Sequence, residues 1–167
     1  MAEPKPTDTK SPEAKINEKK WSKTLMDSGY TVLPNIIIEH QRDLDINSTE
    51  LNIILYLASR WWKADGKPFP SKATMAASIG LEPRTIQRNI ANLQNRGLIR
   101  REERRNTSTG SRTNIYHLDG LIKAARPFAI AKQKNRELAD EAKAKKSTKS
   151  GKAPLSLVVV NPEEAEF

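Results

Sequence analysis

Residues 71–118 decide the fold, and they read SKATMAASIGLEPRTIQRNIANLQNRGLIRREERRNTSTGSRTNIYHL. Ser71 introduces a first short helix, in which Ala76 is small enough for another helix to pack closely against it. Gly80 suits a tight turn, because glycine adopts a positive φ at little cost. Pro83 suits the first turn of a second helix, where its missing N–H group would have no helical partner. The pattern therefore predicts two helices joined by a tight turn.

The second predicted helix, residues 82–96, has one apolar face and one polar face. Ile86, Ile90 and Leu93 recur at helical spacing, which places them on the buried side. The opposite side carries residue types that bind base edges and phosphates. Its members are Arg84, Thr85, Gln87, Arg88 and Asn92. We expect these residues to contact DNA; the alternative is a solvated helix face in a structural bundle.

A β-hairpin is predicted over residues 98–118, where an apolar strand start and a return strand flank a small polar tip at 106–111. The arginines expected to contact phosphates or the minor groove are Arg101, Arg104, Arg105 and Arg112. The alternative is a charged hairpin edge that prevents association with other sheets. Ser71, which also caps the first helix, and Lys72 complete the predicted DNA-binding set.

These elements together resemble the winged helix-turn-helix family, and more narrowly the domains of phage and plasmid replication initiators and related mobile-element regulators. The phrases that carry the resemblance are PSKATMAASIG, PRTIQRNIANLQNRGLIRR and GSRTNIYHL, and it covers roughly residues 30–122. It implies a mainly α fold with a small β-hairpin, called the wing, in which helix 82–96 enters the major groove and the wing grips the neighbouring backbone. Glu82 departs from the family, which usually has a Ser or Thr cap there; glutamate caps less well, although its charge suits a helix N-terminus.

The charge distribution supports the same interpretation. The chain of 167 residues has a net charge of +9. Residues 21–81 are neutral overall, whereas residues 82–112 carry a net +5 and residues 119–152 a net +6. Every basic residue in 82–112 is arginine, which pairs with guanine and phosphate in a forked geometry that lysine cannot match.

The remaining chain divides into flanking segments around one domain. Residues 1–22 are polar and are predicted to be a disordered tail. Residues 23–122 form the predicted winged domain, residues 123–146 a basic helical extension, and residues 147–167 a flexible C-terminal tail. The helical extension is open to two interpretations, non-specific contact with the DNA backbone or a solvated helix that helps assembly.

Within the predicted domain, Ser48 or Thr49 is expected to cap an apolar core helix with Glu50 in its first turn. The buried face of this helix is predicted to contain Leu51, Ile54, Leu55, Ala58 and Trp62, widened by Ile53, Leu57 and Trp61. The paired tryptophans suggest base stacking, but their place at the end of an apolar helix favours a core role. Pro127 is expected either to kink the helix after the hairpin or to begin a second one.

The function predicted from these features is sequence-specific binding of double-stranded DNA, with a transcriptional regulator as first choice. The alternatives are a replication initiator that binds origin repeats and recruits replication proteins, and a structural or adaptor protein that uses the winged domain for protein contacts. The sequence leaves open whether the protein is a homodimer, and the C-terminal tail is a candidate segment for binding a protein partner. RNA is a weaker expectation, since a helix cannot enter the narrow major groove of A-form RNA.

Catalysis and membrane insertion have little support in the sequence. There is no cysteine, the two histidines are not clustered, and we expect no catalytic residue, no metal site and no cofactor. No apolar run approaches the roughly 18 residues of a membrane helix. The N-terminus lacks the apolar centre of a signal peptide. We therefore expect a cytoplasmic, nucleoid-associated protein that is not an enzyme and does not bind membranes.

Overall fold

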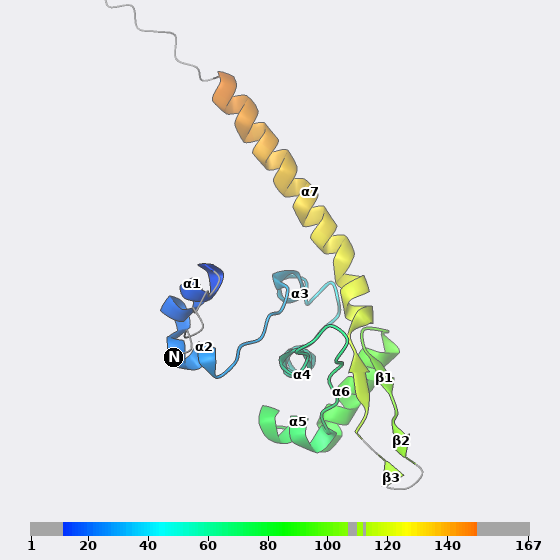
Figure 1. The fold of residues 1–167 in the computed structure, drawn as a ribbon. Helices are drawn as coiled ribbons and strands as arrows, with labels where there is room; N and C mark the ends of the chain where they lie inside the picture. Colours follow the sequence, from blue (N-terminus) through cyan, green and yellow to red (C-terminus); the bar gives the residue numbers. More distant parts are fainter. Residues whose placement is uncertain (1–11, 107–109, 112, 150–167) are drawn as a thin grey trace, which may run out of the picture. The chain divides into compact units, whose positions relative to one another are not determined.

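The computed structural model describes residues 12–106, 110–111 and 113–149, and it is mainly helical with a small antiparallel hairpin (Figure 1). This confirms the predicted fold class. The helices are α1 (Pro12–Trp21), α2 (Lys23–Asp27), α3 (Asn35–Glu39), α4 (Ser48–Ser59), α5 (Lys72–Ile79), α6 (Pro83–Asn95) and α7 (Asp119–Lys149). The strands are β1 (Arg100–Glu102), β2 (Arg105–Asn106), β3 (Gly110–Ser111) and β4 (Ile115–His117). The described residues fall into two units, which divide after Pro127.

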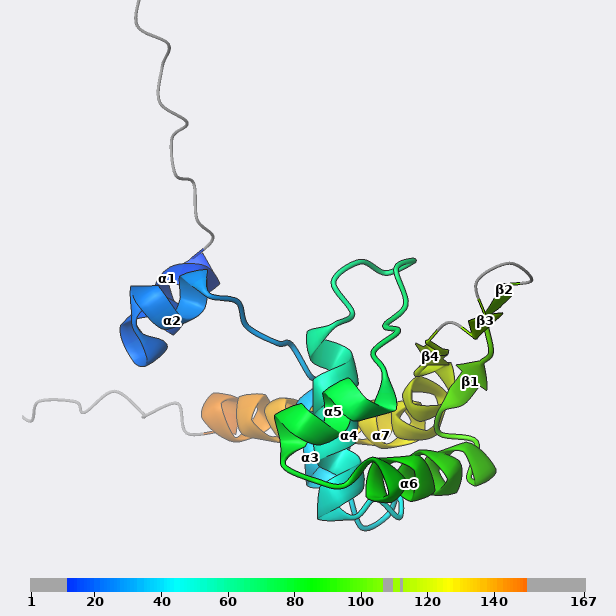
Figure 2. The same cartoon turned by 90° about the horizontal axis from the view of Figure 1, so that it is seen from below.

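The core of the first unit lies where α4, α5 and α6 pack against one another (Figures 1 and 2). The predicted apolar face of α6 is confirmed, because Ile86, Ile90 and Leu93 are all buried. Helix α4 contributes Ile53, Ile54 and Leu57, and α5 contributes Met75 and Ala76. At roughly 1.5–3 kcal/mol for each large apolar side chain removed from water, this shared cluster fixes the orientation of α6.

Helix α4 begins one residue earlier than its predicted caps allow. Asn47, rather than Ser48 or Thr49, is the N-cap: its side chain accepts a hydrogen bond from the Glu50 N–H at 2.9 Å. The Glu50 carboxylate in turn accepts from the Asn47 N–H at 3.0 Å, which completes a capping box. The sequence pattern favoured the hydroxyl residues, although asparagine is an equally good cap.

The end of α4 also differs from the prediction. The helix stops at Ser59, so Trp61 and Trp62 lie beyond it and no longer follow helical spacing. Trp61 is half-buried, whereas Trp62 is 81% exposed. The expectation that Trp62 belongs to the core was therefore wrong. Leu51, Leu55 and Ala58 are half-buried rather than buried, because the helix turns Ile53, Ile54 and Leu57 most directly inward.

The turn between α5 and α6 follows the sequence pattern closely. The Ser71 hydroxyl caps α5 by accepting from the Thr74 N–H at 3.0 Å. Gly80 ends α5 in the left-handed conformation at φ 78°, which explains the glycine at this position. Pro83 is the first residue of α6, as predicted, and Glu82 precedes it without making a side-chain cap.

The hairpin consists of two short pairings. Strand β1 pairs with β4, so that Arg101 lies opposite Tyr116, and β2 pairs with β3 nearer the tip. Tyr116 is 1% exposed, and its N–H donates to the Pro68 carbonyl at 2.9 Å, which attaches the hairpin to the loop between α4 and α5. Tyr116 therefore fixes the base of the wing to the rest of the domain.

The start of α7 is joined closely to the end of α6. The Leu121 N–H donates to the Leu98 carbonyl at 2.8 Å, and Leu121 is buried. Gly120 lies so close to this backbone that a Cβ atom would overlap the Gly97 carbonyl oxygen and stand 3.1 Å from that of Leu98. A glycine at position 120 is therefore a steric requirement.

The flanking segments differ in part from their predictions. Helix α1 occupies residues within the predicted disordered tail; its first residue is proline, Glu13 lies in its first turn and two lysines in its last turn, so local preference favours a helix although no residue is buried. Helix α7 continues through Pro127, so no second helix begins there; the flanking alanines, lysines and arginines are strong helix formers. The predicted C-terminal tail from residue 150 onward, with residues 1–11, lies outside the described residues. In the described part, no helix is long and apolar enough to cross a membrane.

Candidate nucleic-acid interface

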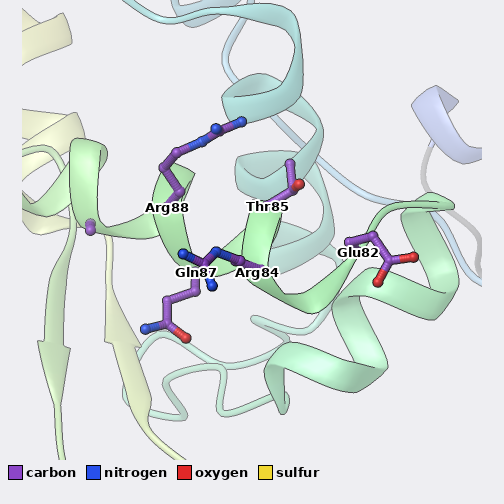
Figure 3. Close-up of a pocket in the computed structure, with 6 residues that line it drawn as sticks. Glu82, Arg84, Thr85, Gln87 and Arg88 are labelled. Atoms are coloured by element: carbon purple, nitrogen blue, oxygen red, sulfur yellow. The ribbon is translucent and has the colours of Figure 1, made fainter.

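The N-terminal half of α6 presents four of the predicted DNA-binding residues on one surface (Figure 3). Arg84, Thr85, Gln87 and Arg88 line a single open hollow of about 760 Å³ together with Glu82 and Ala91. Thr85 is half-buried, and the other three predicted residues are exposed. We call this hollow and its lining residues the α6 surface. Its position follows from the packing of Ile86 and Ile90 on the opposite side of the same helix.

The two arginines of the α6 surface are not engaged in the fold. Within the described residues, neither Arg84 nor Arg88 forms a side-chain hydrogen bond or an ion pair. They are four residues apart, which brings their side chains to the same side of the helix. An external anion would therefore meet guanidinium groups that need not break an internal contact first.

Gln87 is held in place by a residue of the neighbouring helix. The Lys72 ammonium, at the start of α5, donates to the Gln87 side-chain oxygen at 3.0 Å. This contact leaves the amide N–H groups of Gln87 as its outward donors. Lys72 thus touches the predicted base-reading residue directly, whereas the Ser71 hydroxyl is occupied by the α5 cap and by Thr74 Oγ1 at 2.7 Å.

Asn92 lies apart from the other predicted residues of α6. It is exposed, but it lines a different hollow of about 380 Å³. The other residues around that hollow are Asp45, Asn47, Glu50, Asn95 and Arg96. The carboxylates of this set make the site less suited to a phosphate group than the α6 surface is.

Arg96 belongs to the fold, although the charge pattern counted it with the DNA-facing arginines. Its guanidinium donates to the carboxylate of Glu50, which is 1% exposed, and lies 3.1 Å from a carboxylate oxygen of Asp45. The hydrogen bond to Glu50 raises the pKa of Arg96 above its ordinary value; burial opposes this shift, and Asp45 adds to it. Arg96 therefore stabilises the junction of α4 and α6.

The wing arginines occupy different environments. Arg101 is half-buried and lies 3.5 Å from Glu103. Arg104 donates through Nε to the Thr113 carbonyl at 3.2 Å, and its guanidinium lies 4.9 Å from the centre of the Phe69 ring. Arg104 is therefore partly used within the fold. Arg112 and the side chain of Arg105 lie outside the described residues.

Three features of this region escaped the sequence interpretation. Asn89 is a buried polar residue of α6; it donates to the Thr85 carbonyl at 2.9 Å and accepts from the Asn47 side chain at 3.5 Å. Glu82 lines the α6 surface, where its charge opposes the binding of a phosphate. Trp62 lies on the surface; the turn-forming Asp65-Gly66 pair follows both tryptophans, so it did not mark the end of α4 at Ser59.

Comparison with known proteins identifies the central part of the chain. Residues 44–99 match a family described as "Helix-turn-helix domain". Residues 44–99 form a helix-turn-helix domain. They contain α4, α5 and α6, which confirms the predicted type of domain, and the hairpin that follows gives the helix-turn-helix the element order of a winged helix.

Solved structures resemble the chain more distantly. The N-terminal domain of DnaD protein from Geobacillus kaustophilus HTA426 is 18% identical, with a TM-score of 0.49, over 72% of this chain and 97% of that one. The YusO protein from Bacillus subtilis is 17% identical, with a TM-score of 0.38, over 83% of this chain and 99% of that one. No curated protein sequence matches the chain. The assignment of the helix-turn-helix domain rests on residues 44–99 and on the geometry above.

Proposed function

We propose that the protein binds double-stranded DNA site-specifically, with α6 in the major groove. The observation that carries this proposal is the pair Arg84 and Arg88, exposed on the helix-turn-helix and without an internal partner among the described residues. The major groove admits an α-helix, and forked contacts from arginine to guanine distinguish one base pair from another. Gln87, oriented by Lys72, supplies a further donor toward base edges on the same surface.

The wing has the second role in this proposal. It follows α6 directly, and its base is fixed to the domain through Tyr116. Arg101 and Arg105, with Arg112 beyond the described residues, are the proposed phosphate contacts, and Arg104 divides its role between DNA and the fold. Asn92 is a weaker member of the proposed set, because it lies beside carboxylates.

Replacement of the α6 arginines tests the proposal. A bound sequence is first selected from a random duplex pool, and the affinity of the full chain for it is compared with that for a scrambled duplex. Arg84→Ala and Arg88→Ala should each weaken binding to the selected site roughly 5- to 100-fold and reduce the preference over the scrambled site. Arg42→Ala, which removes an exposed arginine outside α6 and the wing, is the matched control.

The expected salt dependence provides an independent check. Each lost phosphate contact should reduce the slope of log affinity against log salt concentration by about 1. If both α6 variants bind the selected duplex as the parent chain does, at low and at moderate salt, α6 is not the reading helix.

The biological role that we propose is transcriptional regulation. A dimeric regulator should select inverted half-sites, whereas a replication initiator should select tandem repeats. An adaptor that uses the winged domain for protein contacts should show no duplex preference and should form a complex that is insensitive to salt. Selection from genomic fragments therefore distinguishes the three roles, which the fold alone does not.

A further inference from the structure

A second surface of the domain gathers aromatic side chains that the core does not use. Trp62 is 81% exposed and Phe69 is 57% exposed, although both types are usually turned inward. They border a pocket of about 270 Å³, which we call the aromatic pocket. Its lining residues are Tyr56, Arg60, Trp62, Phe69, Pro70 and Thr74, from the end of α4, the following loop and α5.

Hydrogen bonds hold two of the rings of the aromatic pocket, Trp62 and Tyr56, in defined positions. The Trp62 indole N–H donates to the Ser59 carbonyl at 2.6 Å, which anchors one edge of the ring and leaves its faces accessible. The Tyr56 hydroxyl accepts hydrogen bonds from Arg60 at 3.3 Å and from Ser78 at 3.5 Å. Because these side chains are already ordered, binding of a flat ligand would cost little conformational entropy of the protein.

Cations surround these rings. Arg60 lies 5.4 Å from the centre of the Tyr56 ring and Arg104 lies 4.9 Å from that of Phe69. In the adjoining loop, Lys67 lies 4.6 Å from the Trp61 ring and 3.9 Å from the carboxylate of Asp119. Both arginines next to the pocket can thus contact a polyanion while the rings offer flat apolar faces.

This combination selects one class of ligand. Proteins bind single-stranded nucleic acid by stacking its bases on aromatic side chains and placing cations along its phosphates. The pocket is just below the size range of typical small-molecule sites, about 300–1,000 Å³, which suits one ring system rather than a larger ligand. An apolar peptide would use the rings but would gain nothing from the flanking arginines.

We propose that the aromatic pocket binds an unpaired base of single-stranded DNA, stacked on Trp62 with Arg60 and Arg104 beside its phosphates. The α5 helix links the pocket to the α6 surface, because Thr74 lines the former and Lys72 contacts Gln87 on the latter. A DNA strand that leaves its duplex next to α6 thus meets the pocket. The stacking of a base rests on the pocket itself, whereas the choice of DNA as the strand rests on the proposed duplex binding.

The test uses the full chain and a fluorescent oligothymidylate of roughly 12 nucleotides, a length within the usual range for single-strand sites. Trp62→Ala should weaken binding roughly 5- to 100-fold, the effect of losing one base stack, and Phe69→Ala should weaken it to a smaller degree. Trp21→Ala is the matched control, because Trp21 is also exposed, at 59%, but lies on α1. Circular dichroism and thermal unfolding establish that each variant is folded, as expected for changes at exposed positions.

Two further experiments distinguish binding at the aromatic pocket from binding at the α6 surface. Arg84→Ala/Arg88→Ala should weaken binding to duplex DNA and leave the affinity for oligothymidylate unchanged, while Trp62→Ala should do the reverse. Tryptophan fluorescence of the parent chain should fall on adding oligothymidylate, and this quenching should be lost in Trp62→Phe. The proposal is overturned if Trp62→Ala binds the strand as Trp21→Ala does, if the α6 double variant alone loses strand binding, or if oligouridylate binds more tightly than oligothymidylate.

Discussion

Helix α6 carries arginines at both ends, and the two ends use them differently. Arg84 and Arg88, near its start, have no hydrogen-bond or ion-pair partner among the described residues. Arg96, just after its end, binds Glu50 and Asp45. The same residue type, separated by two or three turns, therefore stabilises the fold at one end and remains available to a ligand at the other.

The difference shows that a count of basic residues overstates the available charge. Glu50 and Asp45 precede Arg96 by more than forty residues, so the sequence around α6 gives no sign that this arginine is engaged. Arg104 in the wing is a second basic residue that is engaged within the fold, because a carbonyl and an aromatic ring hold its guanidinium. Availability depends on partners that only the folded chain brings together.

The largest effect should come from removing the partner of Arg96. Glu50→Ala eliminates the buried carboxylate that accepts a charged hydrogen bond from Arg96 and completes the α4 capping box. Loss of both contacts should lower the free energy of unfolding by about 3 kcal/mol. Urea denaturation measures the change.

Arg84→Ala provides the contrast for this prediction. It removes an exposed side chain, so its free energy of unfolding should stay within about 0.5 kcal/mol of the parent value. Equal stability of Glu50→Ala and Arg84→Ala would contradict the distinction between the two ends of α6.

An intermediate effect is expected in the wing. Arg104→Ala should lower the free energy of unfolding by about 1 kcal/mol, because it loses the hydrogen bond to Thr113 and the contact with Phe69. The matched variant is Arg100→Ala, since Arg100 is 64% exposed and makes a surface ion pair of 3.5 Å with Glu102. Its stability should be nearly unchanged. If the two variants unfold at the same temperature, the contacts of Arg104 with Thr113 and Phe69 do not stabilise the fold.

The smallest effect concerns pH and compares two tyrosines. Burial raises the pKa of Tyr116 above its ordinary value of 10.0, although the charge of Arg101 and a hydrogen bond with Asn114 oppose the shift. The contribution of Tyr116 to stability is thus complete below about pH 10 and is lost as the pH rises through the raised pKa. Tyr116→Phe should therefore lose less stability than the parent on titration above this pH.

Tyr56 should behave in the opposite way. The hydrogen bond from Ser78 lowers the pKa of Tyr56, burial opposes this, and Arg60 lowers it further. Its contribution appears at alkaline pH and is lost as the pH falls through the lowered pKa, so Tyr56→Phe should lose more stability than the parent at high pH. Thermal unfolding across the alkaline range compares both variants, and identical profiles would contradict the assigned shifts.

Local signals made much of this fold predictable. The Ser71 cap, the left-handed turn at Gly80 and Pro83 at the start of α6 each depend on a few neighbouring residues, and all three are where the sequence places them. The apolar face of α6 was predictable for the same reason, because helical periodicity is a local property.

The sequence-based predictions were wrong or incomplete where contacts between distant parts of the chain determine the environment of a residue. Trp62 was assigned to the core from its apolar surroundings, but α4 ends at Ser59 and the indole bonds back to that residue. Arg96 and Asn89 owe their roles to the start of α4. For the candidate site, the residues of the α6 surface line one hollow, whereas Asn92, one helical turn beyond Arg88, lines another that it shares with carboxylates from a distant part of the chain.

The tight junction at Gly120 has a consequence for the hairpin that lies between α6 and α7. Because the backbone at Gly120 touches that of Gly97, and Leu121 is bonded to Leu98, the two feet of the hairpin are closed into a ring of main-chain atoms. Because of these contacts, the two ends of the hairpin cannot rotate independently of each other. The chain therefore enters and leaves the hairpin at two points that are bonded to each other, so its base cannot open without breaking the Leu121–Leu98 hydrogen bond.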